Sequence, residues 1–118
     1  MYADLDGMKA INDRHGHAAG DEALRAAARL LRATFREADL VARIGGDEFC
    51  VLLPGRAAEA KAGVDRLRNA VEGQSRDFPA VALSLGVAEG APGGTIEELI
   101  ERADAAMYAD KANRSGRN

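Results

Sequence analysis

Acidic side chains gather at two places in the 118-residue sequence. Asp4 and Asp6 alternate at the end of a short apolar run, and Asp47 and Glu48 follow two glycines between longer runs. Mg²⁺ prefers oxygen ligands and commonly combines one or two protein carboxylates with substrate phosphates. Carboxylates held close together in a partly buried site favour uptake of such a cation. If the two places meet in the fold, they predict a metal-dependent site for a nucleotide.

An ordinary solvated turn is the alternative interpretation of both places. Gly and Asp are common hairpin residues, and acids at strand ends are usually exposed. His15 and His17 offer a second candidate metal pair, but two histidines around one glycine with no nearby Cys are a weak signal. A structural hydrogen-bonding role is favoured for His17, and the residues alone leave the two interpretations of the acids open.

The second acidic place is predicted to be the tip of a β-hairpin. Runs with period-two alternation lie on both sides of it, which indicates two strands joined by a short turn. Gly45 and Gly46 tolerate the positive φ of tight turns and let a ligand approach the backbone. The alternating residues are Leu40, Ala42 and Ile44 before the tip and Phe49, Val51 and Leu53 after it.

The other elements follow from apolar spacing. A short strand is expected at 2–7, a helical turn at 8–13 and an irregular stretch at 14–20, after which Asp21 opens a long helix. A second helix extends to Gly73, and residues 80–88 form a central strand with small residues on one face. Thr95 and Glu98 form a capping box for the last helix, and the tail from Asn113 is expected to fray. The order predicts one sheet with helices against its faces.

Composition narrows the class of protein. The length suits a single domain over residues 1–118, and the net charge of -3 argues against a nucleic-acid binder. No apolar run approaches a membrane span and no signal pattern begins the sequence, so a cytoplasmic protein without direct membrane contact is expected. The lone Cys50 is expected to be a small core residue.

The sequence from Gly45 to Phe49 resembles the signature of the GGDEF family of diguanylate cyclases, and matches in the family's order extend over nearly the whole chain. They include Asp4-Leu5-Asp6, Lys9, Ile11-Asn12-Asp13, Gly16-His17, Gly20-Asp21, Leu24, Arg43 to Phe49, Ser84 to Val87, Arg102-Ala103-Asp104 and the segment from Met107 to Lys111. The resemblance implies an α/β (α+β) fold, with a central, mostly antiparallel sheet flanked by helices and a palm-like, nucleotidyl-cyclase-like arrangement.

The resemblance also implies an activity. Two GTP molecules would condense into cyclic di-GMP and two pyrophosphates by metal-dependent nucleotidyl transfer, with Mg²⁺ or Mn²⁺ as cofactor. Each domain would hold one GTP, so catalysis would need a homodimer, and a sensory domain would be fused to the domain or regulate it. Asp4 and Asp47 would bind the metal with the Leu5 carbonyl, and Glu48 would assist at the metal and in activating the 3′-hydroxyl.

Further positions carry over as a substrate site. Asn12 and Asp21 match residues that read the guanine edge, and an Asp can accept from the paired donors that adenine lacks. Gly45 and Gly46 would approach the phosphates. Lys111 would reach the triphosphate, whose far end the backbone amides of Gly7, Met8 and Lys9 would hold. An exposed lysine at a helix end is the alternative for Lys111.

Arg36-Glu37-Ala38-Asp39 resembles the inhibitory Arg-x-x-Asp site of this family, five residues before the signature. Arg36 and Asp39, with Arg66 as a partner, would bind the cyclic di-GMP product, because an arginine fork suits phosphates and guanine edges. The alternative is a plain Arg and Asp at a helix end.

The sequence departs from the family pattern at three points. It has neither the opening helix nor the full first strand, so we expect a truncated domain in which Asp4 is weakly anchored. Gly7 replaces a common aromatic residue. The interval from Lys111 to Arg117 is longer than usual, which leaves Arg114 and Arg117 as alternative phosphate contacts.

A catalytically silent sensor module that binds GTP or cyclic di-GMP is the competing functional hypothesis.

Overall fold

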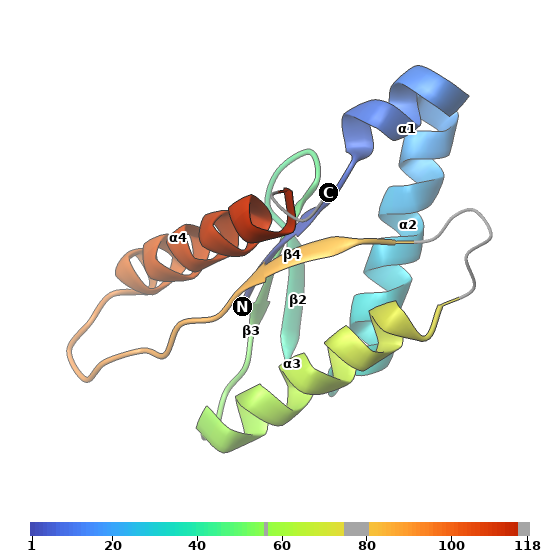
Figure 1. Cartoon of the computed structure of the whole chain (residues 1–118). Coiled ribbons are helices and arrows are strands. Elements are labelled where there is room, and N and C mark those ends of the chain that lie inside the picture. The colour runs from blue at the N-terminus through green and yellow to red at the C-terminus, as the bar shows by residue number, and fades with distance from the viewer. Residues whose placement is uncertain (56, 75–80, 116–118) are drawn as a thin grey trace.

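The computed structural model describes residues 1–55, 57–74 and 81–115, excepting the side chains of 114 and 115. These ranges contain four strands and four helices (Figure 1). In chain order they are β1 (Tyr2–Leu5), α1 (Met8–His15), α2 (His17–Thr34), β2 (Leu40–Arg43), β3 (Glu48–Leu52), α3 (Ala57–Glu72), β4 (Leu83–Gly86) and α4 (Ile96–Ser115).

The four described strands form one antiparallel sheet in the order β2-β3-β1-β4. This confirms the predicted α/β (α+β) fold with a mostly antiparallel sheet, and it confirms the predicted hairpin, which is formed by β2 and β3. β1 lies between β3 and β4, so Asp4 has Glu48 as its ladder partner on one side and Ser84 on the other. The weak anchoring expected for Asp4 is therefore wrong, because β1 is paired along both edges and buried throughout.

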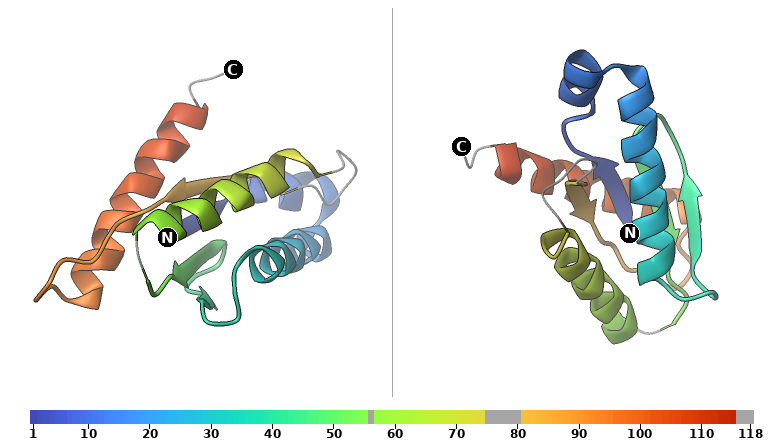
Figure 2. Two further views of the ribbon diagram at one scale, coloured as in Figure 1. Left: turned by 90° about the horizontal axis from the view of Figure 1, so that it is seen from below. Right: turned by 90° about the vertical axis from the view of Figure 1, so that its right-hand side faces the viewer.

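Helices cover both faces of the sheet (Figures 1 and 2). Because side chains alternate along a strand, Ala3, Leu5 and Phe49 enter the main core with α2 and α3. Tyr2 lies on the opposite face and packs with Ala103 and Met107 of α4. This second face also carries Asp4, so α4 and the acidic end of β1 lie on the same side of the sheet.

The close approach of α4 to β4 depends on a glycine. A Cβ at Gly86 would collide with the backbone oxygen of Ala103 and the backbone nitrogen of Met107. This confirms that small residues on this strand admit a helix. The prediction of a central strand is wrong, however, because β4 lies at one end of the order of the described strands, and Ala80 falls outside the described residues.

Two predicted helix boundaries are also wrong. The expected irregular stretch at 14–20 is helical except at Gly16, and α2 begins at His17 rather than at Asp21. Gly16 separates α1 from α2 with φ of 88°, in a region that favours glycine. At the other end, α4 continues through Asn113 to Ser115 instead of fraying there. In the described part of the chain, no helix combines the length and apolar character needed to span a membrane.

Candidate functional site

Asp4 and Asp47 meet at the end of β1, which is the condition on which the metal site expected from the sequence depends. The backbone amide of Leu5 donates a 2.9 Å hydrogen bond to the carbonyl oxygen of Asp47, which joins the strand end to the hairpin tip. Burial raises the pKa of Asp47, and its interaction with the nearby Asp4 carboxyl raises it further. Two carboxyls in this arrangement repel one another when both are ionised, so the pair favours a bound cation.

Lys111 supplies a positive charge to this pair from α4. Its Nζ lies 2.6 Å from Oδ2 of Asp4, whose side chain is only 5% exposed. The hydrogen bond with Asp4 is the main cause of a raised pKa for Lys111. The other oxygen of Asp4, Oδ1, is buried without a hydrogen-bond partner. Asp4 therefore keeps one acceptor that nothing in the described residues satisfies.

These residues fit a magnesium ion that relies on substrate for its remaining ligands. Among the described residues, no group of three or more His, Cys, Asp and Glu side chains is placed to hold a metal. Two carboxylates and an orphaned, buried carboxylate oxygen match the small number of protein ligands that Mg²⁺ takes when nucleotide phosphates and water complete its shell. Asp4 and Asp47 could hold such an ion.

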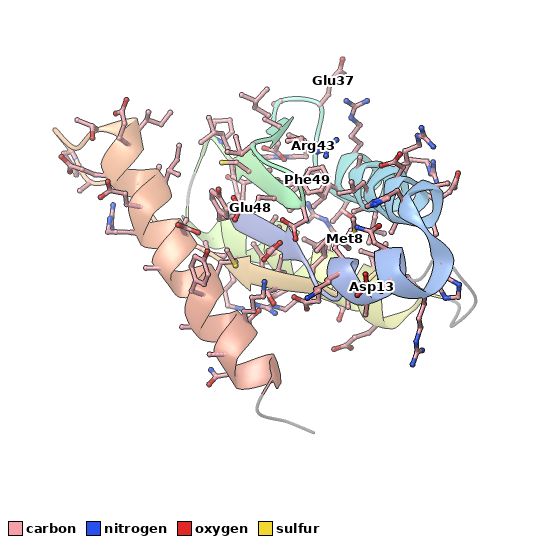
Figure 3. All side chains as sticks on the ribbon, turned by 90° about the horizontal axis from the view of Figure 1, so that it is seen from above. Met8, Asp13, Glu37, Arg43, Glu48 and Phe49 are labelled. Atoms are coloured by element: carbon pink, nitrogen blue, oxygen red, sulfur yellow. The ribbon has the colours of Figure 1, made fainter. Side chains whose placement is uncertain are left out.

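Glu48, which is labelled in Figure 3, begins β3 and is the ladder partner of Asp4. Its Oε2 accepts a 2.7 Å hydrogen bond from the hydroxyl of Tyr2. Burial raises the pKa of Tyr2, and the hydrogen bond and charge of Glu48 add to the effect. Sequence reasoning missed Tyr2, because the contact depends on the pairing register of strands 46 residues apart.

The hairpin tip is fixed by Arg43, which sequence reasoning also missed. Its Nη2 donates to the carbonyl oxygen of Gly46 at 2.7 Å, and its Nε donates to that of Gly45 at 3.1 Å. These bonds hold the backbone of the tip without using the carboxylates that follow it. An arginine two residues before Gly45 was the available signal.

Asn12 and Asp21 line a cavity of about 290 Å³ that also includes Gly46 and Asp47. The structure therefore brings Asn12 and Asp21, the predicted base-reading residues, to the same cavity as Asp47. Oδ1 of Asn12 is buried without a hydrogen-bond partner, and a Cβ at Gly20 would collide with it. The Oδ1 acceptor of Asn12 is thus left unsatisfied among the described residues.

The remaining lining of this cavity comes from Met8, His17 and Leu24. His17 is exposed at the first position of α2. The side-chain hydrogen bond expected for His17 is not found among the described residues.

The residues predicted to hold the far phosphates form the start of α1. Gly7 precedes the helix with φ of 74°, a conformation that glycine adopts readily, and Met8 and Lys9 occupy the first turn. The first N–H groups of a helix have no acceptor within it and favour anions. The structure thus places these three amides beside the end of β1. Arg117 lies outside the described residues, and so does the side chain of Arg114.

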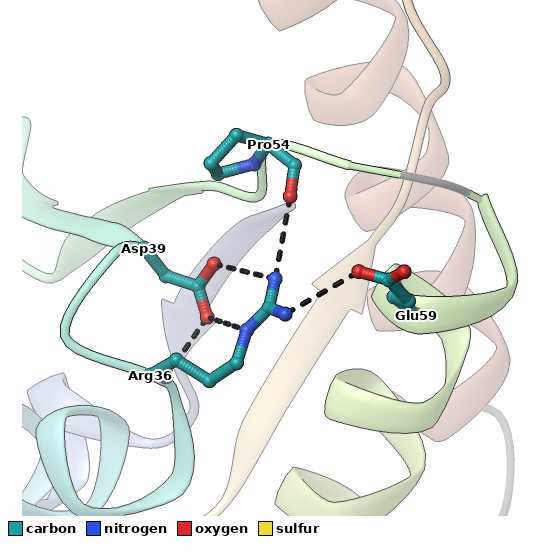
Figure 4. Close-up of polar contacts among 4 residues, drawn as sticks. All are labelled: Arg36, Asp39, Pro54 and Glu59. Atoms are coloured by element: carbon teal, nitrogen blue, oxygen red, sulfur yellow. Dashed lines mark hydrogen bonds and ion pairs between the residues drawn. The ribbon is translucent and has the colours of Figure 1, made fainter.

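Arg36 and Asp39 form a separate polar cluster (Figure 4). The backbone amide of Arg36 donates to Oδ2 of Asp39 at 2.8 Å, and Nη2 donates to Oδ1 at 3.3 Å. Nη1 also donates to Glu59 at 3.3 Å, and Nη2 to the carbonyl oxygen of Pro54 at the same distance. The guanidinium is half-exposed, so it can exchange these partners for a ligand.

Asp39 orients this cluster from a buried position. Burial alone would raise the pKa of Asp39, but hydrogen bonds from Arg36 and the charges of Arg36 and Arg66 outweigh it and lower the pKa. Arg66 is thus near the cluster. The adjoining cavity of about 460 Å³ is lined by Arg32 and Arg36, and Arg66 is not part of its wall. Glu59, Pro54 and Arg32 were not predicted.

A larger hollow lies at the opposite end of β3 from the tip. Its volume is about 790 Å³, and most of its lining is apolar, including Leu40, Val51 and Leu99. Glu89 is its one charged residue among the described side chains that line it. The carboxyls of Asp21 and Asp47 instead line the smaller cavity at the hairpin tip.

Comparison with known proteins places this site in a family. The family described as "Diguanylate cyclase, GGDEF domain" matches residues 1–118. Diguanylate cyclase A of Treponema denticola is 37% identical over 124 residues, which cover 100% of this chain and 33% of that protein. The chain thus spans about a third of the length of this curated relative.

Solved structures agree with the sequence match. Diguanylate cyclase SiaD of Pseudomonas aeruginosa, in complex with its activator SiaC, has a TM-score of 0.86 at 36% identity over 95% of this chain and 45% of that chain. The GGDEF domain of DgcB from Caulobacter crescentus, in complex with c-di-GMP, has a TM-score of 0.83 at 34% identity over 99% of this chain and 72% of that chain. The acidic strand end, the Gly-Gly-Asp-Glu-Phe hairpin and these matches together make the chain a member of the GGDEF domain family.

Proposed function

We propose that this chain is the catalytic domain of a diguanylate cyclase. In the reaction, the 3′-oxygen of one GTP bonds to the α-phosphorus of a second GTP, the bond to pyrophosphate breaks, and the hydroxyl proton is released. The reciprocal step closes the ring, so two GTP yield cyclic di-GMP and two pyrophosphates. The observation that carries the proposal is the meeting of Asp4 and Asp47 beside the cavity that contains Asn12 and Asp21.

In this proposal the acidic pair binds the triphosphate through a divalent cation. Asp4 and Asp47 would hold Mg²⁺ or Mn²⁺ with the Leu5 carbonyl, because oxygen ligands suit both ions. The bound ion would supply a Lewis acid that polarises the α-phosphate and stabilises the charge of the leaving group. Glu48, beside the pair, would orient the attacking 3′-hydroxyl and accept its proton. The orphaned Oδ1 of Asp4 supports this assignment.

Lys111 would exchange partners when the metal and nucleotide arrive. In the structure it neutralises Asp4 at 2.6 Å. The Lys111 ammonium would leave Asp4 because of repulsion from a cation bound there, and it would find new acceptors on the triphosphate. The amides of Gly7, Met8 and Lys9 would then hold the far end of the phosphate chain.

The cavity beside the tip would select guanine. Asp21 can accept from the ring N–H and the exocyclic amino group of guanine, a pair of donors that adenine lacks on that edge. Oδ1 of Asn12 provides an acceptor, and its burial without a partner supports a polar ligand there. Gly45 and Gly46 would let the tip approach the phosphates.

Regulation would act through the second polar cluster and through other chains. Arg36 and Asp39, with Arg66, would bind cyclic di-GMP and inhibit the enzyme. A bound cyclic dinucleotide would replace Glu59 and the Pro54 carbonyl as partners of Arg36. Each domain would bind one GTP, so two copies must face each other. The SiaD complex with its activator supports control by a partner, such as a sensory domain.

Incubation of the chain with GTP and Mg²⁺, followed by chromatography of the products, tests the activity. We expect cyclic di-GMP to form, and Asp47→Ala to abolish it while the circular dichroism spectrum is unchanged. If the unsubstituted chain forms no cyclic product, the proposed diguanylate cyclase activity is refuted.

A silent cyclic di-GMP sensor is the second candidate, favoured by the ordered cluster around Arg36. It requires two results together. The chain forms no product, and it binds cyclic di-GMP in a calorimetric titration that Arg36→Ala abolishes. Turnover of GTP by the chain would exclude a silent role.

A further inference from the structure

Tyr2 is the one described residue whose side chain hydrogen-bonds Glu48. Its hydroxyl donates to Oε2 at 2.7 Å, and its ring is only 5% exposed. Nothing in the signature around Glu48 calls for this tyrosine, which lies on another strand. The contact is part of the structure that surrounds the acidic pair.

The strand register makes this contact. β1 and β3 pair with Tyr2 opposite Cys50 and Asp4 opposite Glu48. Side chains two residues apart share a face, so Tyr2 and Glu48 are diagonal neighbours on the face that carries Asp4. Diagonal neighbours in a sheet are within reach of aromatic and long side chains. Tyr2 can therefore fix Glu48 without competing for Asp4.

The ring of Tyr2 is itself held firmly. It packs against Ala103 and Met107 of α4, both of which are buried. A buried ring has few accessible rotamers, so its hydroxyl is a fixed donor. Glu48, by contrast, has three rotatable side-chain bonds and is only half-buried. The hydrogen bond restrains one carboxylate oxygen, and the second oxygen keeps its acceptor capacity.

We propose that Tyr2 is a positioning residue that holds Glu48 in place for the nucleotidyl transfer. This inference rests on the proposed cyclase activity. A carboxylate that acts on a reacting hydroxyl must lie within hydrogen-bond reach of it, and an unrestrained side chain spends less time there. The hydroxyl of Tyr2 acts through Glu48 alone and touches neither substrate nor metal.

Tyr2→Phe is the direct test, because it removes the hydroxyl and keeps the ring against α4. We expect kcat to fall about tenfold, while KM for GTP stays within about twofold and Tm is unchanged. Tyr108→Phe is the matched control, since Tyr108 is the other tyrosine of the chain, lies on α4 and is 56% exposed. It should leave kcat unchanged. A Tyr2→Phe variant with unchanged kcat, or with only a lower Tm, would overturn the proposal.

A spectroscopic measurement separates this proposal from the activity on which it rests. The δ-carboxyl ¹³C signal of Glu48, assigned through Glu48→Gln, should shift and sharpen in Tyr2→Phe and remain in place in Tyr108→Phe. If the chain makes no cyclic di-GMP but the signal responds, the cyclase proposal fails and Tyr2 still fixes Glu48. If the signal does not respond, Tyr2 does not hold Glu48, whatever the activity.

Discussion

At the scale of single residues, the site combines two carboxyls that repel each other with one lysine that relieves the repulsion. Asp4 is buried and Asp47 is drawn toward protonation by its surroundings. Such an arrangement lowers the stability of the metal-free protein, in exchange for a place where a cation binds. Substitutions in this group should therefore change stability and metal binding in opposite directions.

Asp47→Asn removes a charge and keeps the shape of the side chain. We expect Tm of the metal-free chain at neutral pH to rise by a few degrees, because the repulsion from Asp4 disappears. Binding of Mn²⁺ in the presence of GTP should be lost in a calorimetric titration. A lower Tm would show that the two carboxyls do not repel each other in the folded chain.

Lys111→Met should act in the reverse sense. Without divalent ions, loss of the ammonium leaves Asp4 uncompensated and should cost about 1 kcal/mol, after allowing for solvent screening of the half-exposed lysine. Without nucleotide, Mn²⁺ should bind about tenfold more tightly, because the competing cation has gone. Thermal unfolding and a Mn²⁺ titration measure the two effects.

Lys61→Met is the control for this substitution. Its ion pair with Asp65 is also short, at 2.9 Å, but both partners are exposed, so its loss should change neither quantity. Equal effects of the two substitutions would contradict a specific role for Lys111.

At the scale of elements, the end of α2 and the start of β2 are joined by the Arg36–Asp39 cluster. Asp39 has a lowered pKa in the folded chain, so its contribution to stability is present above the ordinary aspartate pKa of 3.8 that applies to the unfolded chain. That contribution is lost as the pH falls through the lower folded pKa. As the pH falls from about 5 to about 2, Tm of the unsubstituted chain should therefore approach Tm of the Asp39→Asn variant.

Asp65→Asn provides the comparison for the pH series, because Asp65 pairs with Lys61 on the exposed surface of α3. Its difference from the unsubstituted chain should stay small at every pH. The groups that face Asp39 are Arg36 and Arg66, and Glu59 shares the guanidinium of Arg36. A constant difference for Asp39→Asn across the series would argue against the lowered pKa.

The contact between β4 and α4 depends on Gly86. Gly86→Ala should destabilise the fold by about 1–3 kcal/mol, because the added methyl group meets the backbone of Ala103 and Met107, which cannot rotate away. Urea unfolding measures this loss. Gly90→Ala, whose Cβ would meet only Leu99 Cδ2 at 3.7 Å, should be tolerated and serves as the control.

At the scale of the whole molecule, the active site we propose is half of a catalytic unit. One chain offers Asp4 and Asp47 beside the cavity that contains Asn12 and Asp21. Two GTP molecules must react with each other, so turnover per chain should rise with chain concentration and then level off. Initial rates over a range of chain concentrations measure this. A constant turnover per chain at all concentrations would mean that a single chain, or a dimer that never dissociates, is the working unit.

Local patterns in the sequence predicted much of this arrangement. The alternation around Gly45 and Gly46 indicated the hairpin, and the small residues of β4 indicated the close helix, because both patterns depend on neighbours along the chain. The start of α2 was missed because His15 and His17 around a glycine are typical of a loop, whereas Gly16 alone makes the break.

The contacts between distant residues could not be predicted in the same way. Lys111 is 107 residues from Asp4, and Tyr2 is 46 residues from Glu48. Both contacts depend on strand order and register, which apolar spacing does not specify. The resemblance to a family indicated that Lys111 belongs to the site, but not that it lies on Asp4 when no metal is present. The place of β4 at one end of the described strand order was missed for the same reason.

The hydrogen bond from the amide of Leu5 to the carbonyl oxygen of Asp47 has a consequence for how the site can be observed. It joins the two halves of the site through backbone atoms, so the side-chain substitutions discussed above remove neither its donor nor its acceptor. The exchange of this single amide proton with deuterated solvent therefore reports how often the strand end and the hairpin tip separate. The hydrogen-exchange rate of the Leu5 amide therefore measures the opening of the site in the unsubstituted protein, and it needs no label on the acidic residues.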